Sequence, residues 1–185
     1  MQQLQQGDGT AFEPLYERYI DQAVRVAYLI TRSQEAAEDV VQETFVQVLR
    51  RITTLRDPEN FRSWFYAILH NTARKSLRKG RGWLLLPFTL NRKEEIDHVE
   101  PLPEEAVAHL DEVAQLRRVL RLLPDSHRIP LILRYYAGLS EAQIAEAIGV
   151  PAGTVKSRLH HARQKLLDLL EANPMPTGGI SHAER

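Results

Sequence analysis

Cysteine is absent from the sequence, and this removes several classes of chemistry at once. Disulfide bonds, thiolate zinc sites, iron–sulfur clusters and cysteine nucleophiles are all excluded. Long apolar runs are missing too: the run from Trp83 to Leu86 ends at Pro87, far short of the roughly 20 residues that span a bilayer. The first residues lack the basic start and apolar stretch of a signal peptide. We therefore expect a cytoplasmic protein with no direct membrane insertion.

Motifs for catalysis and metal binding are scarce as well. Gly80 and Gly82 lie in a connecting stretch and make no phosphate-cradling loop. Neither His-x-x-x-His nor Glu-x-x-His occurs on an expected helix, as a metal site would need. His160 and His161 are adjacent, so on a helix they point about 100° apart. We expect no enzymatic activity, no metal and no cofactor.

An excess of one sign of charge is missing from the whole chain, since 24 Lys+Arg balance 24 Asp+Glu. The charges are nevertheless segregated. Residues 57–93 hold eight basic and two acidic side chains, and residues 126–170 hold six and three. Residues 94–125, between them, hold three basic and nine acidic ones. A basic block binds phosphate whatever the rest of the chain carries, although random clustering of solvated charge is the alternative.

Apolar residues recur at three- and four-residue steps, and no stretch alternates with a period of two. This pattern predicts an all-α protein made of two small helical domains joined by a flexible linker. We expect the domains at 1–80 and 109–171, the linker at 81–108 and a disordered tail at 172–185. The expected helices cover about 10–31, 34–52, 59–79, 109–123, 126–137, 140–148 and 152–171.

Residues 141–160 have the spacing of a helix-turn-helix. Ala145 is small enough for the point where the two helices cross, and Gly149 tolerates the positive φ of the turn. Pro151 opens the second helix, where its missing N–H costs nothing. On that helix Val155 and Leu159 point inward. Polar and cationic residues point outward or lie on the flanks, which suits base edges and phosphates in a major groove, whereas a helical hairpin with a solvated face is the plainer interpretation.

Two further helix faces are candidate binding surfaces. On the helix at 34–52 a polar stripe surrounds an apolar residue with nothing evident to cover it, Val46, which can be a docking surface or an ordinary exposed face. On the helix at 59–79 we expect Tyr66, His70 and Arg74 to stand in a row on the outward side. A ring, an imidazole and a guanidinium among cations can stack on single-stranded nucleic acid, but an ordinary basic helix has the same composition.

Taken in order, these segments resemble an RNA polymerase sigma factor of the sigma-70 family, in its extracytoplasmic-function (ECF) subfamily. The resemblance covers roughly residues 8–170. It rests on Ala11-Phe-Glu-Pro-Leu-Tyr, Ala37-Glu-Asp-Val-Val-Gln-Glu-Thr-Phe, Phe61-Arg-Ser-Trp-Phe with Asn71, Leu123-Pro-Asp, and Gly153-Thr-Val-Lys-Ser-Arg-Leu-His-His-Ala-Arg. It implies an N-terminal sigma-2 helical bundle and a C-terminal sigma-4 helix-turn-helix domain. His161 departs from the family, which often has arginine there, and the patch from Trp83 to Phe88 is unusual.

The resemblance also implies roles for the three faces. Docking on the β′ coiled coil of core RNA polymerase would involve Asp39, Gln42, Glu43 and Val46. Capture of the melted −10 strand of promoter DNA would involve Asn60, Ser63, Tyr66, His70, Asn71, Arg74, Lys75 and Arg78. Reading of the −35 duplex would involve Gly153, Thr154, Lys156, Ser157, Arg158, His160, His161 and Arg163. Further partners implied are the β flap of the polymerase and an anti-sigma factor.

Two other classes of protein account for part of the sequence. A helix-turn-helix regulator with an N-terminal sensing or dimerisation domain explains residues 109–171. It leaves the row at Tyr66 and the stripe at Val46 without a purpose. A pure protein-interaction module has no need of two basic blocks.

Overall fold

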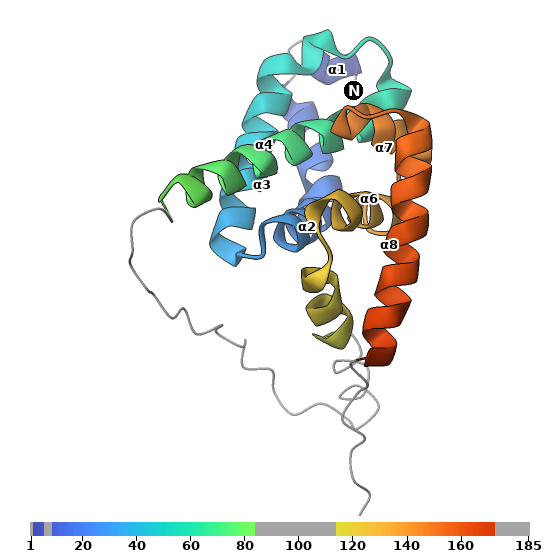
Figure 1. Ribbon diagram of the computed structural model, residues 1–185. Helices are drawn as coiled ribbons and strands as arrows, with labels where there is room; N and C mark the ends of the chain where they lie inside the picture. The colour runs from blue at the N-terminus through green and yellow to red at the C-terminus, as the bar shows by residue number, and fades with distance from the viewer. Residues whose placement is uncertain (1, 6–8, 84–113, 173–185) are drawn as a thin grey trace, which may run out of the picture.

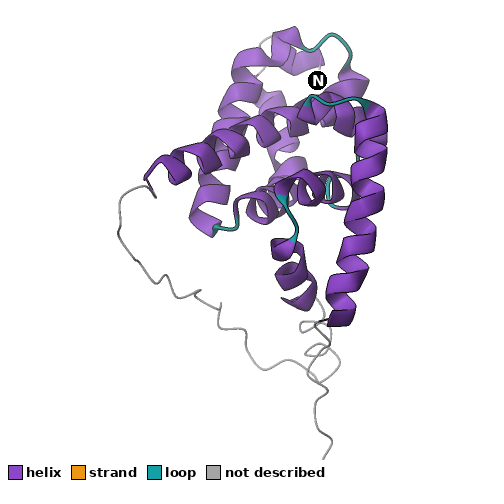
Figure 2. Cartoon of the chain, in the orientation of Figure 1, coloured by secondary structure: helices purple, strands orange, loops and turns teal. Residues whose placement is uncertain are grey.

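The computed structural model describes residues 2–5, 9–83 and 114–172, and side chains within them except at 2–3 and 79–83. The expected linker, the tail and the apolar patch from Trp83 to Phe88 therefore lie outside the described side chains. Helices account for nearly all of the described residues, and no strand occurs among them (Figures 1 and 2). The predicted all-α class is confirmed for this part of the chain.

The N-terminal bundle, our name for residues 9–83, is built on three long helices. They are α2 (Phe12–Thr31), α3 (Gln34–Arg51) and α4 (Phe61–Trp83), and each packs on the other two. Short elements precede or connect them: α1 (Gln2–Gln5), η1 (Gly9–Ala11), η2 (Ile52–Thr54) and η3 (Pro58–Asn60).

Local signals explain where these helices begin. Ser33 caps α3 by accepting a hydrogen bond from the backbone N–H of Ala36 at 3.3 Å. Asp57 caps η3 in the same way, accepting from the N–H of Glu59 at 3.0 Å, and Pro58 follows it at the first helical position. The core between the helices is rich in aromatic rings, for example Phe45 and Phe65 with centroids 5.3 Å apart.

The C-terminal bundle, our name for residues 114–172, begins with a helix at 114–122. It continues with α6 (Asp125–Tyr135), α7 (Glu141–Ile148) and α8 (Ala152–Ala172). The long α8 runs along one side of the molecule in Figure 1 and packs on both α6 and α7. α6, α7 and α8 begin and end within a few residues of the predicted ranges, and the described helix at 114–122 lies inside the predicted range 109–123.

The two bundles pack directly against each other. α4 lies against α7, and α2 lies against α6, as Figure 1 shows. Buried apolar residues of both bundles belong to one continuous cluster, from Val26 and Phe65 to Leu133 and Ile144. The sequence indicates two separate hydrophobic patterns, and nothing in either pattern predicts that they join.

Candidate nucleic-acid interface

The helix-turn-helix predicted from residues 141–160 is present in the structure. Ser140 and Gln143 form a reciprocal capping box at the start of α7, with bonds of 3.2 and 2.9 Å. Gly149 ends α7 with φ +70°, so the predicted need for a positive φ is confirmed. Val150 N–H returns to the carbonyl of Ala145 at 3.0 Å and closes the turn.

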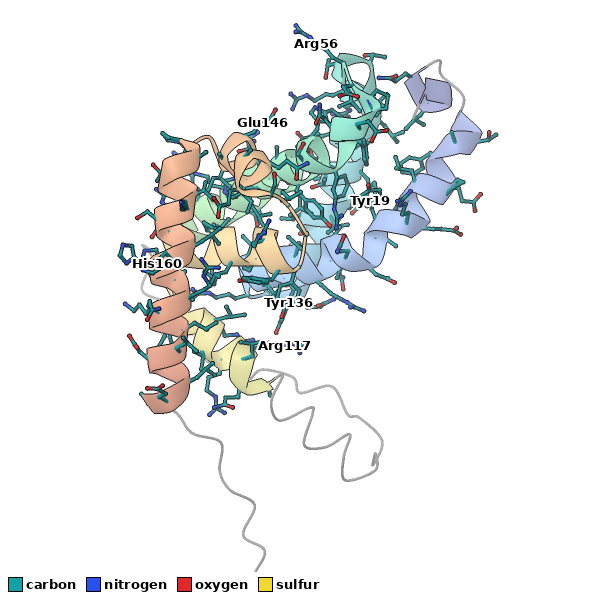
Figure 3. The ribbon with its side chains drawn as sticks, turned by 90° about the vertical axis from the view of Figure 1, so that its right-hand side faces the viewer. Tyr19, Arg56, Arg117, Tyr136, Glu146 and His160 are labelled. Carbon is teal, nitrogen blue, oxygen red and sulfur yellow. The ribbon has the colours of Figure 1, made fainter. Side chains whose placement is uncertain are left out.

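The second helix of this motif, α8, buries one stripe and exposes the other. Val155, Leu159 and Ala162 are at most 2% exposed. Of the residues predicted to read duplex DNA, Thr154 and Arg158 are half-buried and the others are exposed: Gly153, Lys156, Ser157, His160, His161 and Arg163. His160 projects from α8 away from the rest of the molecule (Figure 3). The structure thus leaves this face open to a ligand.

A histidine that the sequence reasoning missed lies close to this face. His127, on α6, has its pKa lowered chiefly by burial, and its neighbours His161, Lys165 and Arg158 lower it further by electrostatic repulsion. Its Nδ1 has no hydrogen-bond partner among the described residues. His127 therefore stays neutral near pH 7, and the positive charge of the face comes from α8.

The stripe predicted on α3 is also exposed. Asp39, Gln42 and Glu43 face solvent, and Val46 is partly covered. Leu49, one turn further along, is 45% exposed and extends the stripe with a second apolar side chain. The sequence reasoning missed Leu49, although its three-residue spacing from Val46 was the available signal.

The predicted outward row on α4 is only partly outward. Asn71, Arg74, Lys75 and Arg78 are exposed, as expected, and so is Asn60, which ends η3 directly before α4. The expectation that Tyr66 and His70 face outward is wrong, and Ser63, placed on the same side, is buried with them. These three side chains are 0%, 6% and 3% exposed, in that order. The physical reason is that α4 is covered on two sides, by the other helices of its own bundle and by α7 of the C-terminal bundle.

The buried side chains of this row have specific partners. The Tyr66 hydroxyl donates to Oε1 of Gln22 on α2 at 2.8 Å, and burial raises its pKa well above the usual range. The His70 ring lies near the backbone of Ala147 on α7. Burial, followed by the charge of Arg74, lowers the pKa of His70. Both rings are therefore uncharged near neutral pH.

Beside the buried row a cleft of about 480 Å³ opens between the bundles. Arg74 and Arg78 of α4 line it from one side and Arg158 of α8 from the other. Asp125 is the one carboxylate among its described lining residues. Cations from two regions far apart in the sequence thus meet in one place, which no local pattern predicts.

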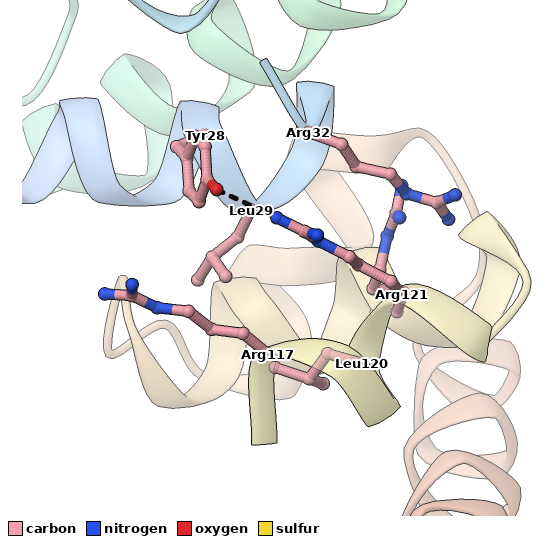
Figure 4. A pocket seen from close by; sticks show the side chains of 7 residues that line it. Tyr28, Leu29, Arg32, Arg117, Leu120 and Arg121 are labelled. Atoms are coloured by element: carbon pink, nitrogen blue, oxygen red, sulfur yellow. Dashed lines mark hydrogen bonds between the residues drawn. The ribbon is translucent and has the colours of Figure 1, made fainter. Parts of the chain in front are cut away.

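A smaller pocket marks a second junction between the bundles, at the end of α2 (Figure 4). There Nη2 of Arg121 donates to the Tyr28 hydroxyl at 2.9 Å, drawn as a dashed line. Beside it Arg128 is 1% exposed, and its Nη2 donates to the carbonyl of Ile30 at 3.0 Å and to Asp125 at 2.8 Å. Arg32 lies 3.8 Å from the same carboxylate.

Two kinds of feature are absent from the described residues. No cluster of three or more His, Asp or Glu side chains within them could hold a metal ion. No helix within them is long and apolar enough to cross a membrane.

Known proteins are similar to this chain in sequence and in fold. The chain matches the family models "Sigma-70 region 2" at residues 15–83 and "Sigma-70, region 4" at residues 114–166. It is 28% identical over 172 residues to the ECF RNA polymerase sigma factor SigW of Bacillus subtilis, covering 90% of this chain and 92% of SigW. It is 33% identical over 174 residues to the ECF RNA polymerase sigma-E factor of Haemophilus influenzae, with 90% of each covered.

Two solved structures have a similar fold. CnrH, in complex with the cytosolic domain of CnrY, superposes with a TM-score of 0.69 at 26% identity, over 93% of this chain and 95% of CnrH. The sigma factor RpoE from Bartonella quintana, in complex with the anti-sigma factor NepR, superposes with a TM-score of 0.72 at 22% identity. The second match covers 89% of this chain and 99% of RpoE, and it shows the shared fold alone.

Proposed function

Since this chain belongs to the ECF subfamily of the sigma-70 RNA polymerase sigma factors, we propose that it binds core RNA polymerase and starts transcription at a restricted set of promoters. The N-terminal bundle then acts as sigma-2, and the C-terminal bundle as sigma-4. The observation that carries this proposal is the open face of α8, held by a helix-turn-helix whose first helix is capped at both ends and whose turn contains Gly149 with a positive φ. We propose a cytoplasmic location, where polymerase and promoter DNA are found.

The −35 duplex is the proposed ligand of α8. The first turns of the helix carry small and polar groups at Gly153, Thr154 and Ser157, which allow close approach to base edges. Lys156 and Arg163 are exposed, and Arg158 borders the cleft. Cations at these positions suit the phosphates on either side of a major groove.

The melted −10 strand is the proposed ligand of α4. Asn71, Arg74, Lys75 and Arg78 lie exposed along the helix and can track its phosphates. Tyr66 and His70 supply rings on which bases could stack, but the C-terminal bundle has to move before they are reached.

Core polymerase is the proposed partner of α3. Its exposed stripe combines acidic and amide groups with two apolar side chains, Val46 and Leu49. Such a mixture of polar rim and apolar centre is typical of protein interfaces. The β′ coiled coil is the expected contact here, and the β flap is the expected contact of the C-terminal bundle.

An anti-sigma factor is a further proposed partner. The family resemblance implies one, and CnrH was solved in complex with part of a second protein, the cytosolic domain of CnrY. The exposed faces of α3 and α8 are surfaces that such an inhibitor could cover.

Run-off transcription with core polymerase tests the proposed function. The purified chain should direct initiation from genomic fragments selected by the reconstituted holoenzyme, and core polymerase alone should not. Failure on every selected fragment contradicts the proposal.

Variants then separate the two binding faces. Gln42→Ala combined with Glu43→Ala should weaken binding to core polymerase and leave duplex binding unchanged, whereas equal loss of both indicates misfolding. Lys156→Ala should weaken −35 duplex binding by roughly 3- to 10-fold and lower its salt slope by about 0.9. Arg118→Ala, an exposed cation on the helix at 114–122, is the matched control and should change neither.

A further inference from the structure

The α4 face formed by Ser63, Tyr66 and His70 has a cover within its own chain. Their exposed fractions are 3%, 0% and 6%. α7 packs on α4, and the backbone of Ala147 lies near the His70 ring. While this packing persists, a DNA strand cannot reach Ser63 or Tyr66, and His70 borders the cleft with only 6% of its surface exposed.

Contacts across the junction are specific and polar. Gln22 joins the bundles through one amide, since its Oε1 accepts from the Tyr66 hydroxyl at 2.8 Å and its Nε2 donates to the carbonyl of Tyr136 at 2.5 Å. A Cβ placed on Gly138 would lie 2.9 Å from Nη2 of Arg62. The backbone of the turn before α7 therefore comes close to Arg62 of α4 at Gly138, a residue without a side chain.

A second anchor holds the same arrangement at the end of α2. Arg128 of α6 donates to the carbonyl of Ile30, and Arg121 donates to the Tyr28 hydroxyl (Figure 4). Both bonds join the C-terminal bundle to α2. The bundles are thus held at two separate places, and the contact at α4 is part of a defined arrangement.

The junction also has features that make it easy to open. Nδ1 of His70 and the Nε and Nη1 of Arg128 are buried without a hydrogen-bond partner among the described residues, and each such atom costs stability. In the adjoining cleft Arg74 and Arg78 face Arg158, with Asp125 as the one carboxylate among the described lining residues. Like charges at close range repel, so a polyanion entering between the bundles gains contacts that the closed chain lacks.

Resting on the function proposed above, we propose that the C-terminal bundle and the single-stranded −10 DNA are alternative partners of one surface, the α4 face of Ser63, Tyr66 and His70. The free chain is closed and masks its own strand-binding face. Binding of the strand requires the open form, so its apparent affinity is reduced by the fraction of chains that are open. The α8 face remains exposed in the closed form, which restricts the masking to the −10 function.

A larger, charged side chain on α7 tests this proposal. Ala147 is 4% exposed and lies on the helix that packs on α4, so Ala147→Glu should force the bundles apart. Ala142→Glu adds the same charge to an exposed position of the same helix and is the matched control. Gln22→Leu, which removes both amide bonds at the junction, is a second opening variant, and circular dichroism checks that each variant retains its helices.

Opening is measured as a distance. Because the chain has no cysteine, spin labels can be attached at Glu17→Cys on α2 and Asp168→Cys on α8, both exposed positions. The parent chain and the Ala142→Glu variant should give one short, narrow distance distribution. The opening variants should give a longer and broader one, and an excess of a random-sequence 12-nucleotide single strand should shift the parent in the same direction.

Affinity is measured with the same single strand carrying a fluorophore. An opening variant should bind it at least about 10-fold more tightly than the parent, if the open form is at most about a tenth of the parent population. A long, broad distance in the free parent, or opening without tighter binding, would overturn the proposal. Run-off transcription decides the proposed function separately, since a chain that closes but cannot initiate contradicts only that function.

Discussion

The two proposed DNA-reading helices, α4 and α8, differ in how they acquire a usable surface. On α8 the reading face is exposed, and the residues that orient it, Ser140 to Leu159, lie in one short stretch of sequence. Among the eight residues proposed to hold the −10 strand, three are buried beneath a bundle that is separated from α4 by 30 residues of the chain. A face defined by a local motif can be recognised from sequence, whereas a face covered by a distant segment cannot.

The largest expected effect comes from removing a core side chain of α8. Leu159 is 2% exposed, and truncation of a buried leucine costs about 2–5 kcal/mol. Leu159→Ala should therefore loosen the C-terminal bundle and uncover α4. Amide hydrogen exchange should show lost protection around Tyr66 and His70 as well as within α8.

The matched control for that variant is on the same helix. Leu167 is 53% exposed, so Leu167→Ala should change neither stability nor exchange by a measurable amount. If Leu159→Ala loses amide protection in α8 but keeps it in α4, the covering of α4 does not depend on the C-terminal bundle. The two faces are then independent, and the difference between α4 and α8 described above no longer holds.

A smaller effect is expected at the turn before α8. Gly149 has φ +70°, and an L-residue in that conformation costs about 1–2 kcal/mol, although a Cβ there would meet no atom within 4 Å. Gly149→Ala should lower the free energy of unfolding by that amount in urea denaturation. Gly153, in the first turn of α8, has no positive φ, so Gly153→Ala should instead stabilise the helix by roughly 0.5–1 kcal/mol.

If Gly149→Ala and Gly153→Ala change the free energy of unfolding equally, backbone conformation at the turn does not orient α8. The α4 face is not expected to respond to Gly153→Ala, because that substitution is confined to an exposed turn.

The smallest effect is a dependence on pH that applies to α4. The pKa of His70 is lowered, so below about pH 6.5 the unfolded chain takes up a proton before the closed form does. The contribution of neutral His70 is therefore complete above that pH and is lost as the pH falls. Arg74 opposes its protonation from the same helix, and Arg158, Arg78 and Asp125 line the adjoining cleft.

The measurement is the spin-label distance between α2 and α8 as the pH is lowered from 7.5 to 5.5. In His70→Gln, which cannot take up the proton, the distance should change less as the pH falls. The residual part is assigned to His127, whose pKa is lowered as well. A change of equal size in His70→Gln would remove His70 from the junction.

Much of the fold was predictable because its signals are local. The three- and four-residue recurrence of apolar side chains indicates each long helix, and the observed ends differ from the predicted ones by only a few residues. The need for a positive φ at Gly149 follows from its place between two helices. The exposed stripe on α3 and the exposed face of α8 follow from helical periodicity once their inner sides are known.

The error at Ser63, Tyr66 and His70 has a physical origin. A tyrosine and a histidine can lie in solvent or be buried with their polar atoms bonded, and helical periodicity cannot distinguish the two. Their burial depends on Gln22, on the carbonyl of Tyr136 and on the backbone of Ala147, which come from three other elements. No spacing within α4 carries that information.

By itself, then, the sequence determined the helices, the helix-turn-helix and the family resemblance, since each depends on residues close together along the chain. Only the tertiary structure decided that the two bundles share one core, that Arg158 meets Arg74 in a cleft, and that α4 is covered. The overall neutrality of the chain gave no sign of the cationic cleft, because a sum of charges contains no distances. Packing between distant segments depends on the complementary shapes and polar partners of whole surfaces, and these arise only when the helices are assembled.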